Sequence, residues 1–273
     1  HTTSKIQNIE DLWRIGSFGF RGEALASAAS VSRMRILSRA TGSDEAAEIL
    51  TEFGVKQAPR KSSREVGTTL SVEELFQNVP ARLKFLKSAT AETSQIKSAL
   101  KALALAHPHI TFTVKVDGSL VFYWPQVNDV CDRVKAVVEV DEVFETSAEI
   151  AGFQARVFAC SPNVTFSQNK KIWTFVKNRW VQDRGLQTAV IEAYRSLLMH
   201  GEYPIAVVYL ECPSEEIDVN IHPTKSQVKF RDSSLPFRVV HRATRNLLEK
   251  APWLHRLLGS PSPQETKSAD NFE

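Results

Sequence analysis

The strongest helical pattern of the chain is followed directly by a hairpin pattern, and this succession fixes the fold class. The segment ATAETSQIKSALKALALAHP carries Thr90 and Thr93 as candidate caps and ends at Pro108. The next residues, ITFTVKVDGSLVFYW, alternate in polarity around an Asp-Gly turn at Asp117 and Gly118, as two antiparallel strands do. A chain that joins a long helix to hairpin strands contains both kinds of element, as α+β proteins do.

The rest of the chain extends this pattern on both sides and indicates two domains. A short helix near Gly22 precedes strand candidates in VSRMRILSRA, EAAEILTEFG and GTTLSVEEL. After Pro125 the pattern restarts with a helix in VCDRVKAVVEV, a single strand in AEIAGFQARVFAC, a β-forming run in KKIWTFVKN, and helices in LQTAVIEAYRSLL and LPFRVVHRATRNLLEKAP. We therefore predict domains at 1–126 and 127–258, followed by a flexible linker at 259–273 that is rich in Ser, Pro and charge.

Composition narrows the setting of the protein. Of the 273 residues 42% are hydrophobic, which allows a substantial core, and the formal net charge of +3 permits contact with nucleic acid without predicting it. The three cysteines stand far apart, which disfavours a disulfide framework or a zinc site. No apolar run approaches the roughly 20 residues of a membrane span, and the first residues do not resemble a signal peptide. We expect a cytoplasmic protein with no membrane contact and no metal site of its own.

The stretch FGFRGEALAS has the ingredients of an anion site. Gly19 and Gly22 let backbone N–H groups approach a ligand, and the helix that follows offers unpaired N–H groups at the positive end of its dipole. Arg21 adds a positive charge. The same residues also fit an ordinary turn before a helix, with Glu23 favouring the helix N-terminus. Spacing alone leaves both interpretations open.

A second stretch, GTTLSVEELFQNVPARLKFLKS, joins a strand to a sharp turn. Pro80 fixes its own φ and moves the preceding residue away from helical geometry. A helix start is expected there, with Arg82 and Lys84 on a solvated basic face. Phe85 and Leu86 are expected to turn inward.

Two further stretches carry cations. In DVNIHPTKSQVKF, Lys225 follows a strand and a His-Pro turn, a position where a lone lysine is ordinarily on the surface without a special role. The stretch KKIWTFVKNRWVQDRG interleaves two tryptophans with Lys170, Lys171, Lys177 and Arg179. Such a patch can follow a phosphate backbone, or it can be a strand edge guarded by lysines.

Together and in this order, these stretches resemble the MutL family of DNA mismatch repair proteins. The segments TSKI, GFRGEALAS, GTTLSVEELFQNVPARLKFL, FVKNRWV and DVNIHPTKSQVKF are similar to the signature blocks of that family. The resemblance implies a GHKL-type α/β sandwich, incomplete at its N-terminus, followed by a domain like domain 2 of ribosomal protein S5. It argues against a type II topoisomerase ATPase, which should carry Gln-Thr-Lys where this chain has HPTK.

The resemblance also implies roles for individual residues. The nucleotide contacts would be Thr3, Ser4 and Lys5 in a lid over ATP, Gly19, Phe20, Arg21, Gly22, Glu23, Ala24 and Leu25 in the phosphate cradle, Gly67 and Thr68 in the pocket lining, and Lys225 at the γ-phosphate. Arg179 occupies the place of the arginine that contacts DNA in the family. Lys177 and Asn178 stand where the family has Asn and Gly, which removes a glycine from the turn and leaves its geometry open.

The same resemblance implies an absence. In the family, a helix with the general-base glutamate and the magnesium-binding asparagine, and then an Asp-x-Gly-x-Gly block for adenine, precede the lid; this sequence contains neither. Hydrolysis needs a base to activate water and a metal to offset phosphate charge. We therefore expect no catalytic residue within this chain, no ATP turnover by it alone, and ATP with Mg²⁺ as the cofactor of the full-length protein.

The implied function is an ATP-gated, DNA-binding and dimerising switch that couples mismatch recognition to downstream repair. Its implied partners are DNA, a MutS-type mismatch recognition protein, a second copy or a paralogue, and a downstream nuclease or helicase. A bacterial protein of this kind is expected at the nucleoid and a eukaryotic one in the nucleus. The alternative is a non-catalytic module that binds nucleic acid or another protein, which the basic patch permits.

Overall fold

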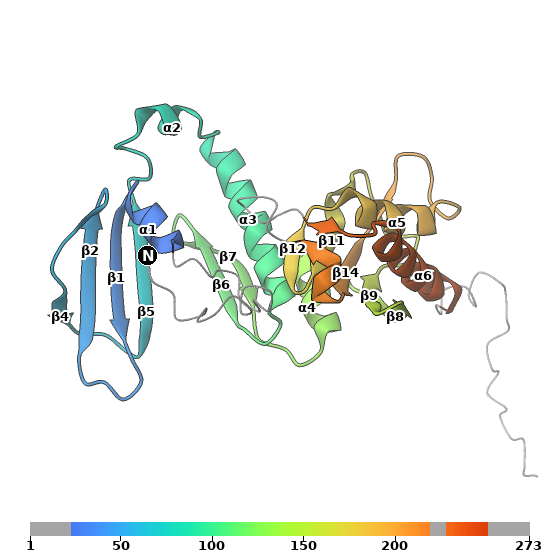
Figure 1. Ribbon diagram of the computed structural model, residues 1–273, viewed down its shortest axis with the longest axis horizontal. Coiled ribbons are helices and arrows are strands. Elements are labelled where there is room, and N and C mark those ends of the chain that lie inside the picture. Colours follow the sequence, from blue (N-terminus) through green and yellow to red (C-terminus); the bar gives the residue numbers. More distant parts are fainter. Residues whose placement is uncertain (1–22, 219–227, 251–273) are drawn as a thin grey trace, which may run out of the picture. The chain divides into compact units, whose positions relative to one another are not determined.

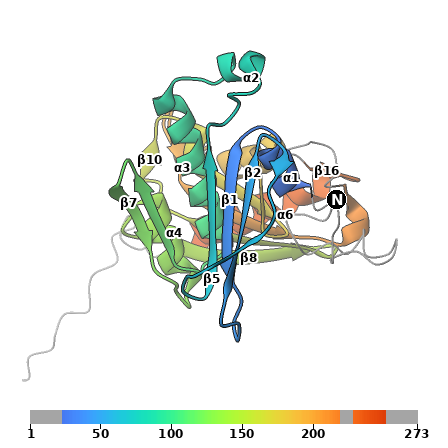
Figure 2. The same ribbon diagram turned by 90° about the vertical axis from the view of Figure 1, so that its left-hand side faces the viewer.

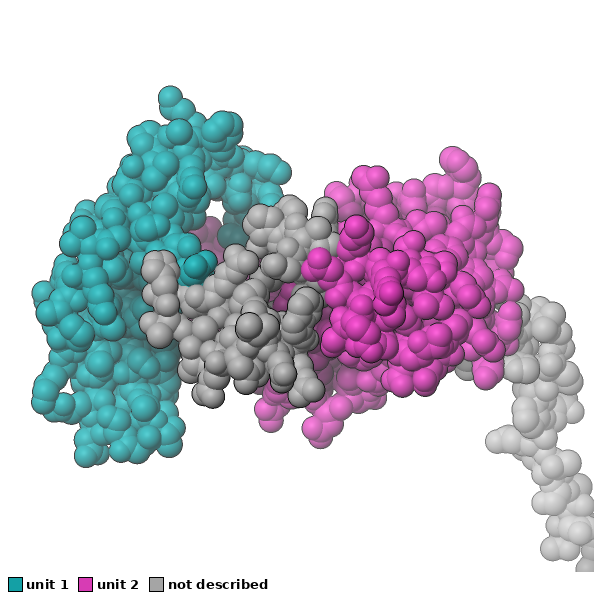
Figure 3. Space-filling view, in the orientation of Figure 1, with its two compact units in different colours: residues 1–96 teal, residues 97–273 magenta. Residues whose placement is uncertain are grey.

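The chain divides into two compact units, which are described separately. The computed structural model describes residues 23–218 and 228–250. Unit 1 comprises residues 1–96 and unit 2 residues 97–273 (Figure 3). Both units mix helices and strands, so the predicted α+β class is confirmed.

Unit 1 is built around one antiparallel sheet with the strand order β3-β2-β1-β5 (Figures 1 and 2). Strand β4 pairs with β2 beside this path. The elements of the unit are α1 (Ala24–Ala29), β1 (Arg33–Arg39), β2 (Ala46–Glu52), β3 (Val55–Lys56), β4 (Arg60–Ser62), β5 (Gly67–Glu73), α2 (Pro80–Lys84) and the start of α3 (Ala89–Ala106). The three strands expected from VSRMRILSRA, EAAEILTEFG and GTTLSVEEL are β1, β2 and β5.

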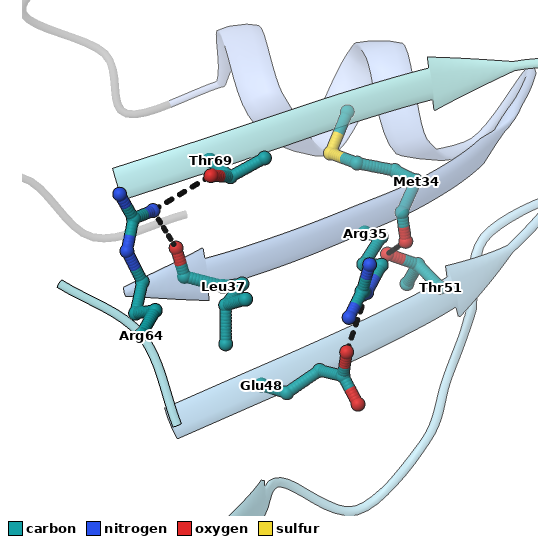
Figure 4. Close-up of polar contacts among 7 residues, drawn as sticks. All are labelled: Met34, Arg35, Leu37, Glu48, Thr51, Arg64 and Thr69. Atoms are coloured by element: carbon teal, nitrogen blue, oxygen red, sulfur yellow. Dashed lines mark hydrogen bonds and ion pairs between the residues drawn. The ribbon is translucent and has the colours of Figure 1, made fainter. Parts of the chain in front are cut away.

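Alternation along β1 separates an apolar from a charged face of this sheet. Met34, with 2% of its surface exposed, stands opposite Thr51 of β2 and Val72 of β5. The next residue, Arg35, belongs to the other face and pairs with Glu48 of β2 (Figure 4). Period-two alternation of this kind is what sets the strand register, because a slip of one residue would exchange the two faces.

The turn at Pro80 is present, but the expected burial after it was wrong. Pro80 is the first residue of α2, whose five residues include no buried side chain. Phe85 is 87% exposed and Leu86 is 38% exposed. A single helical turn offers too short a face to pack both residues. Phe85 and Leu86 therefore do not form a core within unit 1.

Unit 2 contains a mixed five-stranded sheet with the order β12-β11-β14-β9-β8. Strands β11 and β14 are parallel, and the other neighbours are antiparallel. The strands of the unit are β6 (Phe112–Val116), β7 (Ser119–Trp124), β8 (Phe144–Ile150), β9 (Phe153–Ala159), β10 (Thr165–Phe166), β11 (Ile172–Val176), β12 (Arg179–Val181), β13 (Tyr203–Pro204), β14 (Ala206–Glu211), β15 (Ile217–Asp218) and β16 (Lys229–Phe230). Its helices beyond α3 are α4 (Val130–Val138), η2 (Asn169–Lys171), α5 (Arg184–Tyr194), η3 (Ser214–Glu216) and α6 (Ser234–Lys250).

Each face of this sheet carries its own core. One face packs against α5 and α6, and the other against α3, the β6–β7 hairpin and α4. Strand β11 is buried throughout because its residues alternate between the two cores: Ile172 and Val176 face the first, and Trp173 and Phe175 face the second. A central strand buried on both faces reads as a continuous apolar run, as this one does.

The stretch AEIAGFQARVFAC forms two strands, so the expectation of a single strand was wrong. Strands β8 and β9 pair directly on either side of Ala151 and Gly152. Both residues have positive φ, 50° and 79°, which is the geometry of a two-residue hairpin turn. The Ala-Gly pair is a weaker turn signal than the Asp-Gly pair between β6 and β7, which the structure confirms with φ of 50° and 79°.

The two units do not coincide with the predicted domains, because the end of α3 and the β6–β7 hairpin belong to a core of unit 2. Leu105 of α3 and Trp124 of β7 are buried in the same cluster as Val134 of α4. The domain limits at 126 and 258 stay a prediction. Within the described part of the chain, no helix has the length and apolar character needed to cross a bilayer.

Candidate functional site

The structure describes part of the predicted phosphate cradle, at the start of α1. Glu23 is the residue before the helix, its side chain makes no capping hydrogen bond, and its carbonyl accepts from the N–H of Ser27 at 2.8 Å. Leu25 is 52% exposed, so this first turn is open to solvent. The other predicted nucleotide residues lie outside the described ranges: Thr3, Ser4, Lys5, Gly19, Phe20, Arg21, Gly22 and Lys225.

The predicted Gly-Thr pair opens strand β5, opposite the end of β1. Gly67 has a φ of +132°, and a Cβ at this position would lie 3.3 Å from Nη2 of Arg64. The hydroxyl oxygens of Thr68 and Ser38 are 2.8 Å apart in an exposed hydrogen bond. The φ of +132° favours glycine here, and the next residue, Thr68, places a hydroxyl at the strand end.

Arg64 shapes this strand end, although sequence analysis did not single it out. Its Nη1 donates to the carbonyl of Leu37 at 3.0 Å and to Oγ1 of Thr69 at 2.7 Å (Figure 4). Arg39 in turn donates to the carbonyl of Arg64 at 3.2 Å. The two arginines therefore fix the loop that leads into Gly67. No local pattern marks such a loop arginine, because one of its partners, the carbonyl of Leu37, comes from β1.

The turn between β11 and β12 keeps a tight hairpin geometry despite the lost glycine. Lys177 and Asn178 have φ of 49° and 59°, and Val176 pairs directly with Arg179. A two-residue turn with positive φ at both positions is type I′. Asparagine tolerates this conformation better than most residues, whereas lysine adopts it at a cost of about 1–2 kcal/mol. The sequence left the geometry of the Lys177–Asn178 turn open, and the structure shows that this turn is tight.

Arg179 lies at the start of β12 with its side chain half-buried. Burial lowers the pKa of its guanidinium, which nevertheless stays charged at neutral pH because the ordinary value is above 12. Among the described residues, no hydrogen bond or ion pair engages this side chain. A partly desolvated cation without a local anion is suited to bind an external one.

The four predicted DNA-contacting cations fall into two groups at opposite ends of β11. Lys177 and Arg179 follow the strand, and Nζ of Lys177 donates to Oγ of Ser214 at 2.6 Å. Lys170 and Lys171 precede it in η2. At about 3.3 Å per strand residue the groups are on the order of 20 Å apart. One compact cluster is therefore not formed.

A cleft of about 480 Å³ opens on the sheet face of unit 2 that packs against α3. Its lining includes Tyr209, Arg156, Glu211 and Asn178. Arg156 is ion-paired with Glu145. Burial raises the pKa of the Glu211 carboxyl, and the nearby Lys177 ammonium partly opposes that shift. The charges of the lining are balanced, so the cleft has no preference for an anion.

Arg133 of α4 is a buried cation that sequence reasoning did not single out. It is 1% exposed, and its Nη2 donates to the carbonyls of Pro108, Ile110 and Pro125 at 2.9, 2.8 and 2.7 Å. Its Nη1 has no hydrogen-bond partner within the described chain. Burial lowers the pKa of this guanidinium. Arg133 ties both ends of the β6–β7 hairpin to α4.

Over residues 23–218 and 228–250, no group of three or more acidic, histidine or cysteine side chains is placed to hold a metal.

Comparison with known proteins decides the family. The model of the family "DNA mismatch repair protein, C-terminal domain" matches residues 134–249. The DNA mismatch repair protein MutL of Neisseria gonorrhoeae (strain ATCC 700825 / FA 1090) is 43% identical over 256 residues, which are 92% of this chain and 38% of that protein. The MutL protein of Citrifermentans bemidjiense is 37% identical over 94% of this chain and 40% of its own length. The chain belongs to the MutL family of DNA mismatch repair proteins.

Solved structures agree with this MutL-family assignment at the level of the fold. The Aquifex aeolicus MutL ATPase domain complexed with ADP has a TM-score of 0.62 at 24% identity, covering 86% of this chain and 80% of that one. The N-terminal domain of a DNA repair protein has a TM-score of 0.72 at 19% identity, covering 86% and 77%. The fold is therefore that of MutL ATPase domains. The chain spans about two fifths of the length of the MutL relatives that it matches.

Proposed function

We propose that this chain forms part of an ATP-gated mismatch repair protein of the MutL type. The observation that carries the proposal is the sequence identity to two MutL proteins, which is 43% over 92% of this chain for one and 37% over 94% for the other. The similarity in fold to an ATPase domain complexed with ADP supports nucleotide binding. In this proposal the full-length protein binds ATP with Mg²⁺, dimerises, contacts DNA and acts with a MutS-type protein and a downstream nuclease or helicase.

In the described residues, the proposed nucleotide-binding site consists of the solvent-exposed first turn of α1 and of Gly67 and Thr68 at the start of β5. Exposed N–H groups at a helix start favour phosphate oxygens, and the Thr68 hydroxyl adds a polar group at the edge of a sheet. The predicted lid, the remaining cradle residues and Lys225 complete this assignment. The chain's own residues thus hold and orient phosphate, while the metal would offset phosphate charge and the base is expected elsewhere in the full-length protein.

The proposed DNA contact is Arg179. It combines a half-buried guanidinium, no local anion among the described residues, and a tight type I′ turn next to it. The tight turn matters because backbone that is already ordered loses less entropy when a ligand binds. Lys177 supports the turn through Ser214, and Lys170 and Lys171 are proposed as weaker contributors to the same electrostatic attraction.

Nucleotide-dependent assembly of the full-length protein tests the proposal. We expect a non-hydrolysable ATP analogue with Mg²⁺ to raise the apparent molecular mass toward that of a closed dimer, and ADP to do so far less. Analytical ultracentrifugation gives the mass directly. If the protein bound neither nucleotide, the result would instead support the non-catalytic module. If the ATP analogue and ADP raised the mass equally, the γ-phosphate would not control assembly.

A further inference from the structure

A surface of unit 2 carries exposed apolar side chains, which the proposed function does not use, beside two of the lysines proposed above as weaker DNA contacts. Four large apolar residues gather on the two segments joined by β10 and β13, and their exposed fractions are 42% for Val164, 37% for Phe166, 47% for Leu197 and 80% for Met199. Lys170 and Lys171 of η2 adjoin them. We call this surface the β10–β13 corner.

Strand pairing and hydrogen bonds hold the two segments of the β10–β13 corner side by side. Phe166 pairs with Tyr203 in the short ladder between β10 and β13. The carboxylate of Glu202 accepts from the hydroxyl of Thr165 at 3.2 Å with one oxygen and from the N–H of Met199 at 3.1 Å with the other. One side chain therefore links the segment of Phe166 to the loop that carries Met199.

The base of the corner is fixed in the core. The buried hydroxyl of Tyr194, at the end of α5, donates to the carbonyl of Cys160 at 2.6 Å. The N–H of Cys160 donates to the carbonyl of Ile205 at 3.1 Å. The loop between Tyr194 and Ile205 is thus anchored at both ends, so its exposed Leu197 and Met199 are presented on a held backbone, which lowers the entropy lost on binding.

The charges of the corner are positive and unbalanced. Lys171 lies with Nζ 5.0 Å from the ring centre of Phe166 and donates to the carbonyl of Val138 at 3.3 Å. Lys170 is exposed, and no carboxylate of the described residues pairs with it. Glu202 accepts only from neutral donors, so it keeps one negative charge, and the two lysines outweigh it to leave a small net positive charge. A partner of the corner therefore meets cations that its own carboxylates can neutralise.

We propose that the β10–β13 corner docks an acidic protein segment that carries apolar side chains. Phenylalanine and methionine are enriched at the centre of protein–protein interfaces, and methionine adapts to the partner that it meets. DNA fits less well, because its phosphates would face four apolar side chains and one lysine already turned toward a ring and a carbonyl. A second copy fits less well too, since the same net positive charge would be present on both sides of a two-fold interface.

The sequence supplies a direct probe of this surface. The chain has two methionines, the exposed Met199 and Met34 of unit 1, which is 2% exposed. Labelling with ¹³C-methyl methionine in the 273-residue chain gives one signal at the corner and one internal reference. The chain is titrated with an amphipathic peptide that carries Leu and Phe at helical spacing and Asp and Glu elsewhere. A peptide with Lys and Arg in place of the acidic residues, and a DNA duplex, are titrated in parallel.

The acidic peptide is expected to shift the Met199 signal in a saturable way and to leave Met34 unchanged. Phe166→Ser and Lys170→Glu are each expected to weaken this binding at least about tenfold, because one removes an apolar anchor and the other reverses the charge. Lys115→Glu, an equal charge change on the β6–β7 hairpin, should leave it within about twofold. Lys170→Glu alters an exposed side chain, so it remains informative if Phe166→Ser does not fold.

Three results overturn the proposal. Equal shifts with the acidic and basic peptides would show unspecific apolar contact. A Met199 shift with DNA and none with the acidic peptide would assign the corner to DNA. A Met199 signal that changes with protein concentration alone would assign it to self-association.

Discussion

Reversing the charge of Arg179 tests the proposed DNA contact. One guanidinium neutralises one phosphate, and each phosphate contact contributes about −0.9 to the slope of log Kobs against log salt. Arg179→Glu should therefore flatten that slope by about 1. The same contact accounts for roughly a threefold change in affinity between about 50 and 200 mM salt. Fluorescence anisotropy with two unrelated duplexes should show equal effects on both.

The geometry of β11 allows a sharper form of this experiment. The group at Lys170 and Lys171 is on the order of 20 Å from the turn, well beyond the Debye length of about 8 Å at physiological salt. The change of slope caused by Arg179→Glu should therefore add to that of Lys170→Glu in the double variant. Arg242→Glu, an exposed position on α6 with the same change in net charge, is the matched control. An unchanged slope for Arg179→Glu, or an equal change for Arg242→Glu, would refute the assignment.

Three stability measurements test the local geometry by thermal unfolding of the 273-residue chain. Asn178→Val should cost about 1–2 kcal/mol because a β-branched residue cannot easily adopt positive φ, whereas Asn178→Gly should cost nothing; equal melting temperatures would contradict the type I′ turn. Gly67→Ala should cost about 1–3 kcal/mol since φ is +132° and the new methyl group approaches Arg64, and a neutral result would argue against that conformation. Arg133→Met should cost about 1–3 kcal/mol because it removes the guanidinium donor from the part-buried carbonyls of Ile110 and Pro125, and Arg133→Lys should cost less; if Arg133→Lys cost more, these hydrogen bonds would not be the cause.

The elements with regular periodicity could be predicted from the sequence. The helix ending before Pro108 and the hairpin around Asp117 have the expected limits, since polarity and turn residues agree there. The Ala151–Gly152 turn was missed because alanine gives no turn signal. Phe85 was expected to turn inward because it is apolar, but a one-turn helix does not reach a core in which to bury it.

The candidate sites divide in the same way. The roles of Gly67 and Arg179 came from the resemblance to the MutL family and stay predictions. Arg64 and Arg133 could not be predicted, because their partners are carbonyl groups that only the tertiary fold brings to them. The separation of Lys170 from Arg179 follows from the predicted β-forming run KKIWTFVKN, which forms an extended strand with one group at each end.

Binding of nucleotide to the Lys225→Ala variant of the full-length protein tests the central claim most directly. If Lys225 contacts the γ-phosphate of an ATP-gated switch, equilibrium titration should show a much larger loss of affinity for a non-hydrolysable ATP analogue than for ADP. The charge-retaining Lys225→Arg variant should recover part of that loss. Equal losses for the analogue and for ADP, or none for either, would contradict the account.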